Sequence, residues 1–461
     1  MSSSETQATL SPITSAAEAR LPLSLTIGWS VGSLGSATLL NAIGATQLFF
    51  FVTILGMRPA IAGAIIFISK IYDLVTDPPM GLISDRTQTR WGRRRPWMFA
   101  GALISGLAFY LIYNPPAVTG NTMVAVQCAF LLLYATGYTM FNVPYVAMPA
   151  EMTDGYHERS RLISFRVVFQ SFGIVTGNVL ALQLIKIGGS GSQGYALMGQ
   201  VIAFALTVPM LIAVFSTARA RRSERDIEQF SLRQQFAAVT GNQPFLVLMG
   251  AKLLQLFGVA ASNASILFLI KSVLGRNESD LALKFGVPSL VATLAFMPIW
   301  LAIGRRIGKR NTWLLAIVLF VMVSLSFVLA TPHEPDLIFI ARGALFGLCT
   351  GGILLMAQSM LPDTMEYDAR RSGRRREGVF SGVYSAVEKL AFALAPFVIG
   401  ILLETMGFDK SVAVQSADAQ FAIVFGAAVL PAIGFGLSIP VLLLYDLTKE
   451  KLRATTRVEN T

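Results

Sequence analysis

The chain has 461 residues, of which 54% are hydrophobic and only 14% are charged. Soluble domains carry about 25% charged residues, so the composition excludes an ordinary soluble protein. The net charge of +11 would suit a nucleic-acid-binding protein. However, the basic residues lie in short loops between long apolar runs, which is not the pattern of a nucleic-acid-binding surface.

The apolar residues form about twelve runs of membrane-spanning length. A run of about 20 apolar residues crosses a bilayer as a helix, because a helix satisfies its own backbone hydrogen bonds. The sequence therefore predicts an all-α membrane protein. The predicted helices cover 23–52, 60–83, 97–114, 122–147, 163–186, 195–216, 244–271, 282–303, 311–330, 336–360, 379–404 and 419–445.

The basic residues separate between the two sides of the predicted membrane. With the N-terminus inside, 26 of the 37 Lys and Arg residues fall in the tails and the even-numbered loops. Cytoplasmic loops carry the excess of Lys and Arg, so both termini are predicted to be cytoplasmic. The first 22 residues contain no short apolar core of a signal peptide, and we expect the first helix to be retained.

The longest internal polar stretch divides the predicted helices six and six. We predict a cytoplasmic N-terminal tail, a six-helix bundle, a cytoplasmic linker with a short amphipathic helix, a second six-helix bundle and a cytoplasmic C-terminal tail. Their predicted bounds are 1–22, 23–216, 217–243, 244–445 and 446–461. The linker helix is rich in apolar residues on one face, and a plain connecting role is the preferred interpretation.

The two halves repeat each other weakly. Gly92-Arg93-Arg94 with Trp97 is matched by Gly308-Lys309-Arg310 with Trp313, in the loops after helices 2 and 8. Pro149 is expected to end helix 4, and Pro362 to end helix 10 in the same way. Such repetition is typical of two parallel six-helix bundles with a solute cavity between them, the major facilitator architecture.

Helix 2 carries the strongest functional signal, because buried charge is costly and usually functional. Lys70, Asp73 and Asp77 are spaced by three and four residues, so they share one helical face. Two carboxylates on one buried face can bind Na⁺ or take up a proton. Pro78-Pro79 is expected to break the helix below Asp77. The alternative is a structural Lys70–Asp73 ion pair, with Asp77 capping the helix end.

Four other helices carry isolated charges. Glu388 and Lys389 lie about 100° apart on helix 11, so one is expected to face the cavity and the other a neighbouring helix. Arg166 in helix 5 either binds solute or extends to the headgroups. For Lys252 and Arg342, which lie nearer helix ends, extension to the headgroups is the preferred interpretation.

The arginine-rich loops predict a cytoplasmic gate as well as the topology. Asp85, Arg86 and Arg93 lie where the halves meet when the inner side closes, so ion pairs there would bias alternating access. The loops after helices 4 and 10 each carry acids followed by arginines. They complete the predicted gate with Glu151, Arg159, Asp363 and Arg376.

Three stretches together resemble one transporter family. They are Asp73 to Trp97, with Asp77-Pro78 and Ser84-Asp85-Arg86-Thr87; Asn142 to Arg166, with Pro149-Ala150-Glu151; and Pro362 to Lys389, with Glu366-Tyr367-Asp368. With these motifs the chain resembles the glycoside–pentoside–hexuronide:cation symporters, the melibiose permease-like members of the major facilitator superfamily. The resemblance covers about 23–445.

The resemblance implies symport of a small polar organic solute, such as a glycoside, sugar or uronide, with H⁺ or Na⁺. It implies a cation site at Asp73 and Asp77, with Thr139 and Asn142 from helix 4. It also implies a solute site at Arg166, Lys389 and Asn142. From the residues, we add Tyr145, Asn41 and Lys70 as further expected solute contacts.

The chain departs from the melibiose-type pattern at three positions. Asn142 and Ala37 stand where that pattern has acids, and Val146 stands where it has a sugar-stacking Trp. One anionic ligand is therefore missing from the expected cation site, which weakens the case for Na⁺ relative to H⁺. Because Arg166 and Lys389 are retained, the cavity becomes more positive, which motivates an anionic solute as a hypothesis.

Other classes of function remain open as alternatives. A proton-driven exporter, or a carrier of lysolipids and other amphipathic solutes, would use the same fold. An enzyme is not expected, because the sequence contains no nucleophile–base pair or metal cluster, and no cofactor is expected beyond the co-transported cation. We expect a multi-pass protein of the bacterial inner membrane, monomeric, with a small-molecule solute, a coupling cation and lipid as partners and no nucleic acid.

Overall fold

A computed structural model of the chain describes residues 21–153, 156–219, 237–332, 334–373, 376–412, 414–447 and 451. Within these ranges all regular structure is helical, and twelve helices are long and apolar enough to cross a membrane. The predicted all-α membrane fold is therefore confirmed. Most of the predicted linker helix and both predicted tails lie outside the described residues, so the domain bounds stay predictions.

The first six membrane helices follow the predicted order. Two of them contain π-helical turns: the first joins α1 to η1, and the fifth joins α6 to α7 through η2. A short helix, α5 (Pro149–Met152), follows the fourth. The helices are α1 (Leu23–Phe49) with η1 (Phe50–Ile54), α2 (Pro59–Arg86), α3 (Arg95–Tyr113), α4 (Gly120–Ala147), α6 (Tyr156–Val175) with η2 (Thr176–Leu180) and α7 (Ala181–Ile187), and α8 (Ser192–Ser216).

The last six membrane helices mirror this arrangement, again with π-helical turns inside several helices. They are α10 (Gln243–Phe268) with η4 (Leu269–Val273), α11 (Glu278–Asp280) with η5 (Leu281–Gly286) and α12 (Val287–Ile307), α13 (Lys309–Ser326), α14 (Asp336–Ser372), α15 (Glu377–Thr405), and α16 (Ala417–Val424) with η7 (Phe425–Val429) and α17 (Leu430–Leu443).

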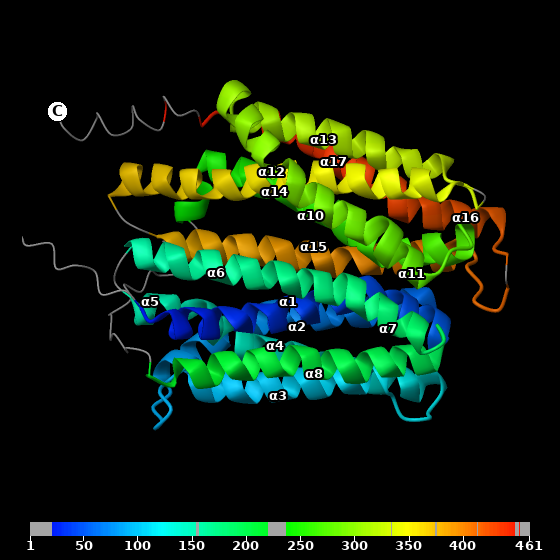
Figure 1. Cartoon of the computed structure of the whole chain (residues 1–461), viewed down its shortest axis with the longest axis horizontal. Helices are drawn as coiled ribbons and strands as arrows, with labels where there is room; N and C mark the ends of the chain where they lie inside the picture. The colour runs from blue at the N-terminus through cyan, green and yellow to red at the C-terminus, as the bar shows by residue number, and fades with distance from the viewer. Residues whose placement is uncertain are drawn as a thin grey trace, which may run out of the picture.

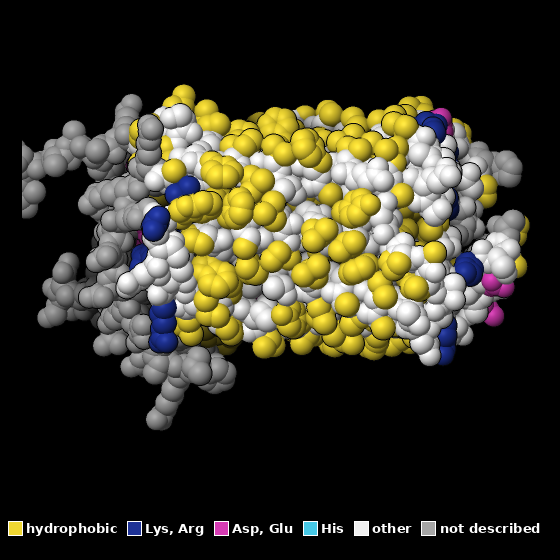
Figure 2. Space-filling model, turned by 90° about the horizontal axis from the view of Figure 1, so that it is seen from below, with side chains coloured by type: hydrophobic (Ala, Val, Ile, Leu, Met, Phe, Trp, Pro, Cys, Tyr) yellow, Lys and Arg dark blue, Asp and Glu magenta, His cyan; other side chains and the backbone are white. Residues whose placement is uncertain are grey.

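The helices form two bundles that lie side by side (Figure 1). The N-terminal bundle holds α1 to α8, and the C-terminal bundle holds α10 to α17. The bundles touch mainly where α2 packs along α15 and α1 packs against α10. Hydrophobic side chains cover the middle of the face seen in Figure 2, and Lys and Arg lie near its two ends, which is the surface of a membrane-embedded protein.

The bundles are joined more tightly at one end than at the other. One hydrophobic cluster combines Phe49 and Phe51 of the N-terminal bundle with Phe268 and Ile399 of the C-terminal bundle. The residues through which this cluster joins the two bundles lie at the end opposite Leu21 and Leu447, the end called here the outer end. At the end near the termini, the inner end, the C-terminal bundle has a separate core around Trp313.

Close backbone packing reinforces the outer end. A Cβ placed on Gly63 of α2 would lie 2.7 Å from the carbonyl oxygen of Pro396 in α15, and Gly400 of α15 faces the carbonyl of Pro59 in the same way. Only glycine permits helix backbones to approach this closely. The two bundles are therefore closed on each other at the outer end.

Two expectations about proline are wrong. α2 continues through Pro78 and Pro79 to Arg86, and α14 continues through Pro362 to Ser372. A proline inside a helix frees carbonyls in the preceding turn, and the helix survives where other groups satisfy them. In α14 the Lys309 ammonium donates to the carbonyl of Ser359 at 2.8 Å, which is one turn before Pro362.

Candidate functional site

The two acids of α2 converge on one hydroxyl of α4. Thr139 Oγ1 lies 2.6 Å from Asp73 Oδ1 and 2.9 Å from Asp77 Oδ1. Asp73 and Thr139 are each only 2% exposed, whereas Asp77 is half-buried. Because Thr139 has a single hydroxyl proton, it donates to one carboxylate at a time. The predicted convergence of Asp73, Asp77 and Thr139 is therefore present. The two carboxylates can also accept hydrogen bonds from one more positively charged group.

Lys389 of α15 supplies that positive charge from the opposite bundle. Its ammonium donates to Asp77 Oδ2 and lies 3.1 Å from Asp73 Oδ2. Lys70, one turn before Asp73, instead places its ammonium 5.1 Å from the centre of the Tyr134 ring. The alternative of a structural Lys70–Asp73 ion pair is therefore not what the structure contains. The acids hold the two bundles together through Lys389.

Arg166 is a half-buried cation without an ion-pair partner among the described residues. Its Nε is buried with no hydrogen-bond partner, and its guanidinium lies 5.6 Å from the centre of the Tyr145 ring. Tyr145 is fully buried, stacks on Trp29 at 4.9 Å and donates from its hydroxyl to the carbonyl of Trp29 at 3.0 Å. The Tyr145 ring thus supports the Arg166 guanidinium. The predicted contact of Tyr145 with solute stays a prediction.

The two predicted asparagine contacts differ in their surroundings. Asn41 of α1 accepts a hydrogen bond from Asn178 of η2 at 3.1 Å and donates to the carbonyl of Ala37 at 2.8 Å. Asn142 of α4 is half-buried, and its side chain makes no hydrogen bond within the described part of the chain. Asn142 therefore keeps its full hydrogen-bonding capacity, whereas Asn41 has used part of its own.

The predicted gate of the N-terminal bundle is an ion cluster around Glu151. Arg93 Nη2 lies 2.7 Å from Glu151 Oε1, and Arg94 binds the same carboxylate and also Asp85 at 3.0 Å. Arg94 is only 6% exposed, and sequence reasoning did not select it among its neighbours. Arg86 is exposed and forms no ion pair within the described residues, and the side chain of Arg159 lies outside them.

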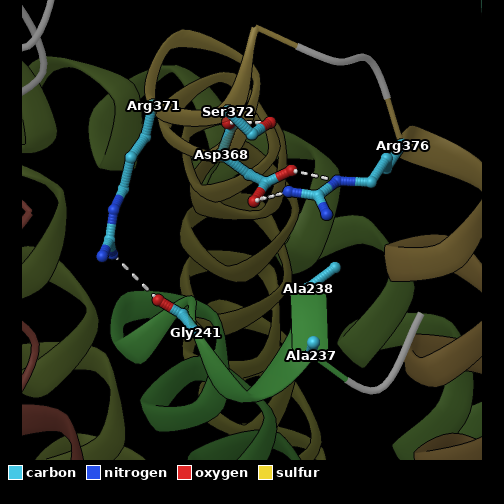
Figure 3. Close-up of a pocket in the computed structure, with 7 residues that line it drawn as sticks. All are labelled: Ala237, Ala238, Gly241, Asp368, Arg371, Ser372 and Arg376. Atoms are coloured by element: carbon cyan, nitrogen blue, oxygen red, sulfur yellow. Dashed lines mark hydrogen bonds and ion pairs between the residues drawn. The ribbon is translucent and has the colours of Figure 1, made fainter. Parts of the chain in front are cut away.

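The C-terminal bundle has its own ion pairs at the inner end. Lys309 pairs with Asp363 at 2.5 Å, and Arg376 binds both oxygens of Asp368 at 2.9 and 3.1 Å. Figure 3 shows Arg376 directed at Asp368 and Arg371 directed at the carbonyl of Gly241, 3.0 Å away, around a pocket of about 240 Å³. The gate residues that form ion pairs among the described residues all pair within their own bundle, so these ion pairs do not join the bundles.

The polar links between the bundles lie elsewhere. At the outer end Glu404 of α15 pairs with Arg58 and accepts from the amide of Ala60 at 2.9 Å. Ser190 donates to Glu278 across the bundles at 3.1 Å. Sequence reasoning missed these links, because their partners lie far apart in the chain and none of these residues belongs to a motif. Together with the Lys389 bridge at mid-membrane, these polar links join the bundles in the middle and at the outer end. Among the described residues, no such polar link joins the bundles at the inner end.

Known proteins resemble the chain over almost its whole length. A family model described as MFS/sugar transport protein matches residues 28–449. YagG of Escherichia coli (strain K12), which carries the name of a glycoside/cation symporter, is 27% identical over 94% of this chain and 93% of its own. A glucuronide carrier protein homolog of the same organism is 25% identical over 93% of each chain.

The fold is also found among solved structures. The crystal structure of the nucleoside transporter NupG covers 92% of this chain and 100% of its own, with a TM-score of 0.63 and 14% identity. At that identity the likeness concerns the fold alone. The helices of this chain are therefore arranged much as those of that structure.

Proposed function

Because the chain belongs to the MFS/sugar transport protein family, we propose that it is a cation-coupled symporter of a small glycoside or uronide that works by alternating access. It is a multi-pass membrane transporter and not an enzyme. The relatives described above carry the names of a glycoside/cation symporter and a glucuronide carrier homolog, which supports symport over the alternatives of export or lysolipid transport. The inner membrane of a bacterium, with both termini cytoplasmic, is the proposed location, and the arginine-rich inner end supports that orientation.

The observation that carries this proposal is the bridge between Lys389 and the two acids. Asp73, Asp77 and Lys389 together have one net negative charge, so the cluster is suited to one further monovalent cation. A proton would neutralise one carboxylate, and Na⁺ would use oxygens of Asp73, Asp77 and Thr139 as ligands. Either ion would compete with the Lys389 ammonium for the same carboxylates.

This competition would couple the ion to movement of the bundles. With Lys389 bound to the acids, the bundles are linked at mid-membrane and at the outer end, while the inner end carries no such link among the described residues. A cation at the acids would release Lys389 and change the relative stability of the two closed states. The solute would bind between the bundles and bias the same equilibrium.

The charge of the membrane interior favours an anionic solute. Lys70, Arg166, Lys252 and Lys389 provide four positive charges, against three carboxylates from Asp73, Asp77 and Glu388. Buried charge in a membrane is stabilised when it is compensated, so an anionic solute would offset part of this positive excess. Arg166, whose Nε lacks a partner, is the proposed ligand of its carboxylate. A uronide has the required chemistry, with hydroxyls and one carboxylate.

The test is transport by the purified full chain in proteoliposomes, with Na⁺ and pH gradients imposed separately. Labelled methyl β-D-glucuronide and methyl β-D-glucoside are the probes. We expect gradient-driven accumulation, with the uronide preferred, and we expect Asp77→Asn to lose accumulation while it retains some exchange. If neither gradient drives accumulation of either probe, the proposed function is wrong. If both probes behave equally, only the anionic preference is wrong.

A further inference from the structure

The first half of α15 presents an exposed polar face inside the membrane. Its exposed residues before Val398 are Gly378, Ser381, Gly382 and Glu388. No large hydrophobic side chain of α15 is exposed before Val398 among those described, whereas the lipid-facing helix α12 exposes Val291, Leu294 and Ile299. A Cβ placed on Gly378 or Gly382 would meet no atom within 4 Å. At these two glycines the face therefore borders open space.

Glu388 is the charged group of that face, and both bundles surround it. It interacts electrostatically with Lys252 of α10, with Lys389 beside it, and with Tyr138 of α4 in the N-terminal bundle. α15 itself runs between α10 and α2 (Figure 1). Glu388 has no ion pair within the described residues, in contrast to Lys389, which is bound to Asp77. Its exposed carboxylate is free to accept hydrogen bonds from a ligand.

Lys252 of α10 lies next to α15 and compensates the charge of Glu388. It is only 6% exposed, and its ammonium lies 5.9 Å from the centre of the Tyr384 ring, one helical turn before Glu388. The expectation that Lys252 extends to the headgroups is therefore wrong, because its side chain is enclosed between α10 and α15. Arg342, given the same expectation, pairs instead with Glu334 at 2.5 Å.

These groups lie at one depth in the membrane. Glu388, Lys252, Arg166 and Asp77 each lie nine to eleven residues from the inner end of their helix. At a rise of 1.5 Å per residue, each lies roughly 14–17 Å from that end. Glu388 is thus level with Arg166 of the opposite bundle and with the cation site. A solute between the bundles at this depth would reach Glu388.

We infer that Glu388 binds hydroxyl groups of the transported solute and that Lys252 positions and compensates its carboxylate. This inference rests on the proposed function and names a solute ligand on the C-terminal bundle. An ionised carboxylate accepts short, strong hydrogen bonds from hydroxyls, so the expected ligand class is a polyhydroxylated glycoside or uronide. The sugar ring lies toward α15, and the anionic group, where present, lies toward Arg166.

The test measures solute affinity and discrimination between hydroxyls in proteoliposomes. Glu388→Gln keeps the size of the side chain and removes its charge. Loss of one charge-assisted hydrogen bond predicts a rise in KM of about tenfold to a hundredfold for methyl β-D-glucuronide and methyl β-D-glucoside. Accumulation at saturating probe persists, because Asp73 and Asp77 are unchanged. The matched control is Glu366→Gln, the same change on an exposed residue at the inner end of α14.

Mono-deoxy derivatives of methyl β-D-glucoside distinguish a direct contact between Glu388 and a solute hydroxyl from an effect of Glu388 on the structure of the site. The wild-type protein is expected to reject one deoxy derivative strongly, and Glu388→Gln is expected to lose that rejection. Lys252→Met should raise KM less, and the double variant should match Glu388→Gln, because Lys252 acts through Glu388. Glu388→Asp provides a charged variant in case Glu388→Gln does not fold, and it should retain the rejection.

Each result decides the inference. If wild-type protein transports a probe and Glu388→Gln has an unchanged KM and unchanged rejection of every deoxy derivative, Glu388 is not a solute ligand, while the proposed function stands. If wild-type protein transports no probe under either gradient, the proposed function and this inference fail together.

Discussion

The two bundles resemble each other at their inner ends and differ at the middle of the membrane. At the inner end each bundle pairs acids with bases of its own: Glu151 with Arg93 and Arg94 in one, Asp363 with Lys309 in the other. At mid-membrane the N-terminal bundle contributes the acids Asp73 and Asp77, and the C-terminal bundle contributes Lys389. The shared part stabilises each bundle, and the divergent part connects them.

This difference shows which interactions can couple cation binding to movement of the bundles. An interaction within one bundle moves with that bundle, so it is not altered when the bundles rotate against each other. An interaction between bundles must break or reform during such a rotation. By this criterion the bridge from Lys389 to the acids is the element that responds to a cation, and the ion clusters at the inner end have mainly a structural role in this conformation.

The largest expected effect comes from removing the mid-membrane bridge. Lys389→Met leaves Asp73 and Asp77 as two adjacent carboxylates without a counter-charge. Since the uncompensated carboxylates would retain a cation in both states, we expect gradient-driven accumulation to be lost. The measurement is accumulation of methyl β-D-glucuronide in proteoliposomes under each gradient. Lys284→Met is the control, because Lys284 pairs with Asp280 and Asp336 within its own bundle. Normal accumulation by Lys389→Met would contradict the role of the bridge.

The second effect concerns Arg166, which has no ion-pair partner among the described residues of the N-terminal bundle. Arg166→Gln removes the proposed ligand of the solute carboxylate, so KM for the uronide should rise about tenfold to a hundredfold. The uncharged glucoside should be affected much less. Competition between the two probes measures this selectivity in one assay. A parallel loss for both probes would show that Arg166 supports the fold of the site without binding the carboxylate.

The third effect tests whether the inner-end clusters differ between the bundles. Glu151→Gln removes the partner of two arginines, one of them the buried Arg94, whereas Asp363→Asn removes the partner of the half-buried Lys309. Breaking a buried ion pair costs about 3–5 kcal/mol, more than breaking an exposed one. Thermal unfolding in detergent should therefore show the larger loss for Glu151→Gln. Equal losses would argue against the greater importance of the N-terminal cluster.

The sequence predicted the helices and the acid pair for a clear physical reason. Hydropathy and helical spacing are local properties, so Leu23–Ile54 and the shared face of Asp73 and Asp77 follow from neighbouring residues. The same local rules failed at Pro78 and Pro362, through which α2 and α14 continue, and near Pro362 a group far along the chain binds a carbonyl of the preceding turn. Lys309, for example, is 50 residues from Ser359.

The partners of the charged residues could not be predicted in the same way. Lys389 lies 312 residues after Asp77, and nothing in the local sequence selects it over Lys70, which is one turn from Asp73. Lys252 was expected at the headgroups because its helix end is near, yet the packing of α10 on α15 encloses it. Tertiary packing decides these pairings, and only the family motifs indicated that Lys389 belongs to the site.

The smallest expected effect separates a solute contact from an internal hydrogen bond. An amide side chain links two helices in each bundle: Asn41 bonds with Asn178 in the first, and Gln255 of α10 bonds with Ser438 of α17 in the second, the latter at 2.9 Å. Gln255 is only 2% exposed, whereas Asn41 is half-buried. Loss of either hydrogen bond costs about 1 kcal/mol of stability.

Asn41→Ala should in addition raise KM severalfold if the asparagine contacts solute, whereas Asn178→Ala and Gln255→Ala should change stability alone. Unfolding temperature and KM, measured on the same preparations, distinguish these cases. An unchanged KM for Asn41→Ala would assign Asn41 to the fold of the N-terminal bundle, and the solute contacts would then lie on Arg166, Asn142 and the C-terminal bundle.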